Sequence, residues 1–217
     1  MPSRRPGGAG GKRDSNRNER VGALCEAALR LFLGAGIEAV TIDEITQGAG
    51  VAKGSFYRYF EDKSQLVEAL FVPVREAFRA ATDRGSVALA EAKTKHELEE
   101  AYRALAVELA STLLPQARLV ELYLQESRAP AVGARAPIGQ LARDVTARAI
   151  ALTRVARERG LLREDLAPNV TALAVVGAVE TLLHHYIQGR DIGEPGAASE
   201  ALISMVLHGV QARARMP

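Results

Sequence analysis

Apolar residues recur every three to four positions along most of this chain, a spacing that places them on one face of an α-helix. The first run begins at Val21 and ends before Gly34, and similar runs follow towards the C-terminus. No stretch alternates with the period of two that is typical of a half-buried strand. The pattern therefore predicts an all-α fold of about nine helices.

Two of the predicted helices are short and lie close together, at residues 41 to 49 and 52 to 59. Thr41 and Glu44 form the pattern of a capping box, in which each side chain satisfies a free backbone donor at a helix start. Gly50 suits the left-handed conformation in which helices often end. A sharp turn between two short helices is typical of a helix-turn-helix, whose second helix enters the major groove.

The second short helix carries side chains that suit DNA. Lys53 and Arg58 can donate to phosphates or guanines, and Tyr57 and Tyr59 can reach phosphates or pack on thymine methyls. The residues predicted to bind DNA are Thr41, Lys53, Gly54, Ser55, Tyr57, Arg58, Tyr59 and Lys63. The alternative is an ordinary helical hairpin, with Phe56 and Phe60 in its core and a solvated charged rim.

The string GVAKGSFYRYFEDKSQL at residues 50 to 66, preceded by TIDEI at 41 to 45, resembles the DNA-binding segment of the TetR family of transcriptional regulators, of the AcrR type. The resemblance implies that Thr41 contacts a phosphate, that Lys53 to Tyr59 form the recognition helix, and that Lys63 holds the DNA backbone. It also implies an N-terminal three-helix DNA-binding domain and a C-terminal helical domain for ligand binding and dimerisation.

Three segments are expected: a basic arm at residues 1 to 18, the helix-turn-helix domain at 19 to 65, and the C-terminal domain at 66 to 217. Residues 1 to 20 hold six basic and two acidic side chains, and the rest of the chain has a net charge of −2. A Gly-rich arm without large apolar side chains should be disordered. It is either a solvated tail or an arm that follows phosphates or a minor groove.

Residues 170 to 187 are apolar nearly all round, so we expect this helix to be covered on both sides. A homodimer would cover both sides, as the resemblance also implies. The alternative is a helix buried wholly within one subunit.

The resemblance further implies that residues 95 to 160 line a pocket for a small apolar or amphipathic ligand. An apolar stripe at helical spacing is more often plain core than the lining of a ligand site. The residues predicted to contact the ligand are Tyr102, Leu105, Leu109, Leu122, Tyr123, Leu141, Val145 and His184. Pro73 predicts a kink, and hence a pivot, in the helix that begins at Asp62.

The composition, with 47% hydrophobic and 25% charged residues, is that of an ordinary soluble protein, and Cys25 is the only cysteine. We find no catalytic motif and no metal-ligand spacing. We therefore expect a cytoplasmic protein with no membrane segment, no catalytic residues, no metal and no cofactor. The leading hypothesis is a dimeric repressor that binds a palindromic operator and is released by a ligand. The alternatives are a helical carrier or enzyme with a vestigial DNA-binding hairpin, and a DNA-binding activator without an inducer.

Overall fold

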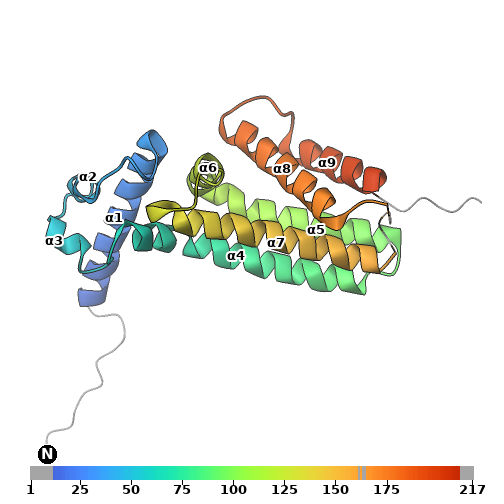
Figure 1. Cartoon of the computed structure of the whole chain (residues 1–217), viewed down its shortest axis with the longest axis horizontal. Coiled ribbons are helices and arrows are strands. Elements are labelled where there is room, and N and C mark those ends of the chain that lie inside the picture. Colours follow the sequence, from blue (N-terminus) through green and yellow to red (C-terminus); the bar gives the residue numbers. More distant parts are fainter. Residues whose placement is uncertain (1–11, 161, 163–164, 211–217) are drawn as a thin grey trace, which may run out of the picture.

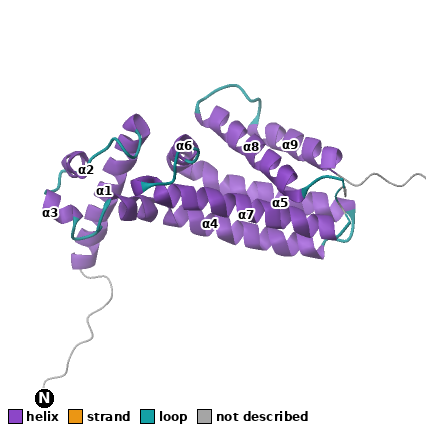
Figure 2. Cartoon of the chain, in the orientation of Figure 1, coloured by secondary structure: helices purple, strands orange, loops and turns teal. Residues whose placement is uncertain are grey.

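The computed structural model describes residues 12–160, 162 and 165–210. Within this part of the chain there are nine α-helices, two short 3-10 helices and no strand (Figure 2). The prediction of an all-α fold is confirmed. The helices are α1 (Lys12–Ala35), α2 (Ile42–Gly48), α3 (Lys53–Phe56), α4 (Lys63–Glu91), α5 (Lys95–Leu113), η1 (Leu114–Gln116), α6 (Ala117–Glu126), η2 (Gly133–Arg135), α7 (Ala136–Glu158), α8 (Pro168–Ile187) and α9 (Pro195–Val210).

The first three helices form a small unit at one end of an elongated molecule (Figure 1). The long helix α4 packs along both α5 and α7, and α8 packs on α7. The short helix α6 contacts α1, α4 and α8. It therefore lies where the small unit meets the long helices.

The predicted capping box at the start of α2 is present. The Thr41 hydroxyl accepts a hydrogen bond from the Glu44 amide at 3.2 Å, and the Glu44 carboxylate accepts one from the Thr41 amide at 2.7 Å. Gly50 has a φ of +66°, as expected for the residue that reverses the chain after α2. Two further side chains, Asp62 and Thr94, cap helices by accepting hydrogen bonds from backbone amides at the starts of α4 and α5.

The recognition helix is shorter than predicted. Its α-helical part is Lys53–Phe56, and residues 57 to 59 form turns instead of continuing the helix to residue 59. Ala52 supplies no side-chain cap, and the aromatic residues that follow are weaker helix formers than alanine or leucine. The amides of Tyr59 and Phe60 both donate to the Phe56 carbonyl, which brings Phe60 back into the core.

The predicted arm needs a correction. Residues 12 to 18, which we expected to be disordered, form the first turns of α1. Extending an existing helix is much easier than nucleating a new one, so the apolar-faced part of α1 carries the helix into this polar stretch. Residues 1 to 11 lie outside the described residues.

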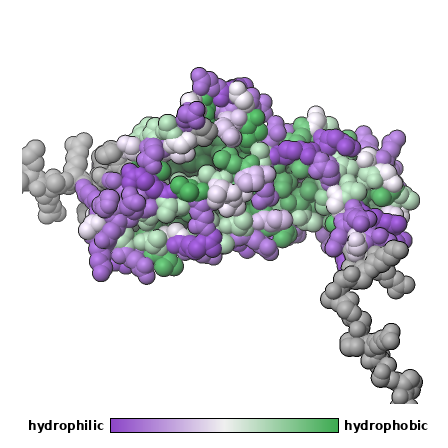
Figure 3. Space-filling model, turned by 180° about the vertical axis from the view of Figure 1, so that it is seen from behind, coloured by the Kyte–Doolittle hydropathy of each residue, from purple (hydrophilic) through white to green (hydrophobic). Residues whose placement is uncertain are grey.

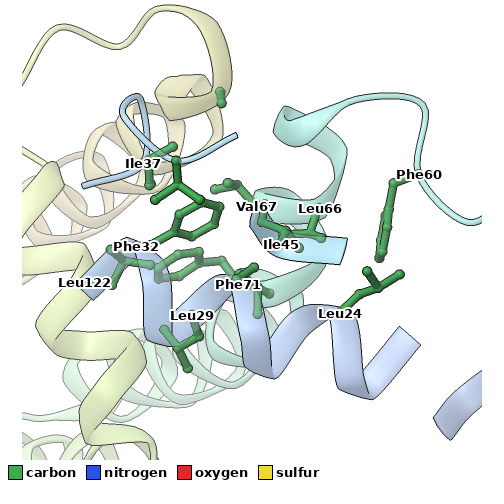
Figure 4. Close-up of a cluster of buried hydrophobic side chains, with 14 of the residues drawn as sticks. Leu24, Leu29, Phe32, Ile37, Ile45, Phe60, Leu66, Val67, Phe71 and Leu122 are labelled. Carbon is green, nitrogen blue, oxygen red and sulfur yellow. The ribbon is translucent and has the colours of Figure 1, made fainter. Parts of the chain in front are cut away.

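A single hydrophobic cluster connects the small unit to the long helices. Phe32 and Ile45 from the small unit are fully buried in it, together with Leu122 of α6 and Ile138 of α7. Figure 4 shows Phe32, Ile37 and Leu122 meeting near Phe71 of α4. The expected boundary between residues 65 and 66 falls inside α4, and the core continues across it.

Helix α8 is strongly apolar and leaves much of its surface uncovered. Val170, Leu173, Val179 and Tyr186 are exposed on it. By length and composition α8 could cross a membrane, a property that our sequence analysis did not predict. The same length and composition suit a helix that is covered by a second protein surface, so the property alone is weak evidence for a membrane.

Candidate nucleic-acid interface and ligand cavity

The side chains of the α2–α3 hairpin separate into a buried set and an accessible set. Phe56 is fully buried, and its ring lies 5.5 Å from that of Phe60, which fixes the hairpin to the core. None of the residues predicted to bind DNA is buried in this core. Thr41, Lys53, Gly54, Tyr57 and Arg58 are exposed, and Ser55, Tyr59 and Lys63 are half-buried.

Lys53 forms an ion pair with Asp43 of α2, with 2.6 Å between the ammonium nitrogen and the carboxylate oxygen. The hydrogen bond to Asp43 raises the pKa of Lys53. Both side chains are more than half exposed, so the pair contributes little stability. Lys53 can therefore exchange Asp43 for a phosphate or a base.

The Thr41 hydroxyl is already engaged as a donor, because it donates to the Glu44 carboxylate at 2.7 Å. The hydrogen bonds from the Thr41 amide and hydroxyl lower the pKa of Glu44. A phosphate contact by Thr41 would require its hydroxyl to turn away from Glu44.

Lys63 has a role in the fold that the sequence did not reveal. Its ammonium donates to the backbone carbonyls of Ile37, Glu38 and Val40, at 2.6, 3.1 and 2.7 Å. Burial lowers the pKa of Lys63. Since an ammonium has three N–H donors, no donor remains for a DNA phosphate in this conformation. The contact of Lys63 with the DNA backbone stays a prediction, and it would require the ammonium to leave at least one of these carbonyls. In this structure Lys63 holds the α1–α2 loop.

The same loop is held from its other side by Glu126, the last residue of α6. Its carboxylate is only 4% exposed, accepts a hydrogen bond from the Ile37 amide at 3.0 Å, and pairs with the Arg135 guanidinium. The Arg135 amide in turn donates to the Glu38 carboxylate at 3.2 Å. Sequence analysis missed Glu126, although it follows the buried Leu122 by one helical turn and so shares its face.

A cavity of about 360 Å³ lies among α4, α5, α6, α7, α8 and α9. On the face shown in Figure 3, apolar side chains gather over the long body, where the surface is hollowed. Six of the residues that we predicted to contact a ligand line the cavity: Tyr102, Leu105, Leu109, Tyr123, Leu141 and Val145.

Two of the predicted residues lie away from the cavity. Leu122 is fully buried in the core cluster, because it is on the face of α6 that meets the small unit. His184 is exposed on α8 and does not line the cavity. Along a helix, neighbouring residues point about 100° apart, so Tyr123 and Leu122 face different surroundings.

The polar end of the cavity is formed by Tyr123 and Glu180. The Tyr123 hydroxyl donates to the Glu180 carboxylate at 2.9 Å, and burial with the nearby carboxylate raises the pKa of Tyr123. Burial also raises the pKa of Tyr102 to about 12. Sequence analysis missed Glu180, because we assigned the apolar segment around it to a dimer interface and only His184 of that segment to the ligand. The sequence signal that could have identified it is that Glu180 is the only carboxylate in the apolar segment of residues 170 to 187.

No group of three or more His, Cys, Asp or Glu side chains is placed to hold a metal ion within the described part of the chain. The two candidate binding sites in the described part of the chain are therefore the exposed α2–α3 hairpin and the apolar cavity with its one carboxylate.

Comparison with known proteins supports a DNA-binding role for the hairpin. A family model described as "Bacterial regulatory proteins, tetR family" matches residues 24–70. The HTH-type transcriptional repressor BepR of Brucella suis is 28% identical over 204 residues, which cover 90% of this chain and 93% of BepR. The DNA-binding segment of the chain matches the TetR family. TetR regulators thus share the DNA-binding segment of this chain, and BepR is similar to almost the full length of the chain.

Solved structures of TetR-type regulators have the same fold. NalD of Pseudomonas aeruginosa, the secondary repressor of the MexAB-OprM multidrug efflux pump, has a TM-score of 0.69 and 20% identity, covering 92% of this chain and 98% of NalD. FadR of Bacillus subtilis in complex with stearoyl-CoA has a TM-score of 0.64 and 18% identity, covering 87% and 98% of the two chains. At these identities the likeness concerns the fold alone.

Replacing Lys63 by methionine should destabilise the protein, because three carbonyls of the α1–α2 loop lose their donor. We expect the free energy of unfolding to fall by about 1–3 kcal/mol. Chemical denaturation at fixed protein concentration measures the change. Lys93→Met, at an exposed position beyond α4, is the matched control and should be neutral. Equal stability of the two variants would contradict the role assigned to Lys63.

Proposed function

We propose that this protein is a homodimeric repressor that binds a palindromic operator through α3 and is released when a small apolar or amphipathic molecule enters the cavity. The observation that carries the proposal is the position of α6. Leu119 and Tyr123 of this helix line the cavity, whereas Leu122 and Glu126 contact the DNA-binding unit.

DNA binding is supported by the exposed side chains of the α2–α3 hairpin. Lys53 and Arg58 supply positive charge, and Tyr57 supplies a hydroxyl and an apolar ring. The match of residues 24–70 to the TetR family points in the same direction. The short α3 limits base reading to a few side chains, so phosphate contacts from neighbouring elements would contribute much of the affinity.

Dimerisation is supported by the uncovered apolar surface of α8 and α9. Val170, Leu173 and Met205 are each more than half exposed. Exposed large apolar side chains on two helices in contact are typical of a protein–protein interface. In a twofold dimer the two copies of α3 would need to lie about 34–36 Å apart to enter successive major grooves.

The contacts of α6 with the DNA-binding unit offer a route from the cavity to α3. Arg118 pairs with Glu26 of α1 at 2.5 Å, and the Gln125 amide donates to the Phe32 carbonyl at 3.5 Å. Together with the Glu126 contact, these bonds tie α6 to the end of α1 and to the loop before α2. A ligand that displaces α6 would displace the hairpin, provided that it binds the displaced state more tightly.

Helix α4 offers a second route. It lines the cavity with Phe71, Val74 and Phe78, and its first residue is Lys63, which holds the α1–α2 loop. Pro73 lies inside this helix, where it removes one backbone hydrogen bond. We retain Pro73 as the proposed pivot of α4.

We predict that DNA selected from a random pool by the purified protein contains an inverted repeat, and that its affinity falls steeply with salt. Lys53→Ala and Tyr57→Ala should change which bases are preferred, whereas Lys93→Ala, far from α3, should not. Fluorescence anisotropy with the selected site and single-base variants measures both effects. A helical carrier or enzyme with a vestigial hairpin would show no selection.

We also predict that Leu173→Glu converts the dimer into monomers, because it places charges in the interface formed by α8. Light scattering after size-exclusion chromatography measures the mass directly. Val107→Glu, on the exposed surface of α5, is the matched control and should remain dimeric. A monomeric parent protein, or a dimer that survives Leu173→Glu unchanged, would contradict the proposed interface.

A further inference from the structure

The chemistry of the cavity wall restricts the ligand more closely than its volume does. Among the described residues that line the cavity, Glu180 is the only one whose side chain is charged at neutral pH. The remaining lining is apolar or aromatic, with a few hydroxyl groups. A carboxylate in such surroundings is costly unless it has a cationic or hydrogen-bonding partner.

The two oxygens of the Glu180 carboxylate have different partners. One accepts the hydrogen bond from the Tyr123 hydroxyl, and the other lies 3.3 Å from the Arg128 guanidinium. The Glu180 side chain is 18% exposed, whereas that of Arg128 is 75% exposed. The bond to Tyr123 therefore belongs to the cavity, and the ion pair with Arg128 lies at its solvent edge.

Water already solvates most of the Arg128 guanidinium, which is 75% exposed, so Arg128 can leave Glu180 at little cost when another cation takes its place. A cation that enters the cavity would bind the Glu180 oxygen that Arg128 releases, while the Tyr123 hydroxyl stays hydrogen-bonded to the other Glu180 oxygen. Displacement of Arg128 into solvent leaves no buried charge behind, because its side chain is already largely solvated.

The aromatic residues of the cavity favour the same class of ligand. Five of the ten Phe and Tyr residues of the chain line it: Phe71, Phe78, Tyr102, Tyr123 and Tyr186. The faces of aromatic rings attract ammonium groups, and more strongly when water is excluded. An anionic ligand would instead face the Glu180 carboxylate in a largely apolar site.

We propose that the cavity takes a lipophilic cation: a molecule with an apolar body and one ammonium group, which binds the Glu180 carboxylate in place of Arg128. This inference rests on the proposed function, because it names the class of ligand that would release the DNA. It concerns binding at the cavity and is testable without DNA.

The test compares three probes with the same ten-carbon tail: decyltrimethylammonium, 1-decanol and decanoate, each below its critical micelle concentration. Isothermal titration calorimetry of the full-length protein measures their affinities. We expect the ammonium to bind about tenfold or more tightly than decanoate. Glu180→Gln should weaken binding of the ammonium by about 10- to 100-fold and leave that of decanol unchanged.

Two further variants test the roles of the neighbouring charges. Glu68→Gln removes a carboxylate from an exposed ion pair on α4 and should leave all three affinities unchanged. Arg128→Ala removes the competitor for Glu180 and should strengthen binding of the ammonium. The proposal would be overturned by a preference for decanoate, by equal affinities for the three probes, by no binding of the ammonium, or by an unchanged ammonium affinity in Glu180→Gln.

Anisotropy with the selected operator separates this inference from the proposed function. If the ammonium binds through Glu180 but the DNA stays bound, the ligand class stands and ligand-controlled release is wrong. If the protein binds its operator but the ammonium does not bind, the ligand class is wrong and the DNA-binding role stands.

Discussion

The loop between α1 and α2 has no regular secondary structure, so its backbone amides and carbonyls must find partners in other elements. Lys63 supplies donors for three carbonyls, and Glu126 supplies an acceptor for one amide. The two side chains belong to α4 and α6, both of which line the cavity. The orientation of the DNA-binding hairpin therefore depends on the two helices that a ligand would touch.

Helix α8 has two surfaces that serve different purposes in this account. One lines the cavity with Val175, Val179 and Tyr186, and the other exposes Leu173 and Val170. Glu180 follows Leu173 by two helical turns, so it lies where the two surfaces meet. If the exposed surface is the dimer interface, a ligand bound to Glu180 lies close to the partner subunit. Ligand binding and the arrangement of the two subunits would then be linked through a single helix, without any contact between ligands.

Much of the fold follows from the sequence, because helical periodicity and caps are local signals. The capping box at Thr41, the turn at Gly50 and the apolar stripes of the long helices were predictable for this reason. The roles of Lys63 and Glu126 were not, since they depend on loop atoms that approach from distant parts of the chain. The same holds for Glu180, which is placed beside Tyr123 only by the packing of α6 against α8.

The central claim is that occupation of the cavity moves the DNA-binding hairpin, and the distance between the two hairpins of a dimer tests it most directly. Spin labels at Gln47→Cys, an exposed site on α2, in a Cys25→Ala background would report this distance by pulsed electron resonance. We expect a narrow distribution on the operator and a displacement of a few ångströms when a ligand that calorimetry shows to bind is added. An unchanged distribution in protein saturated with that ligand would contradict the account.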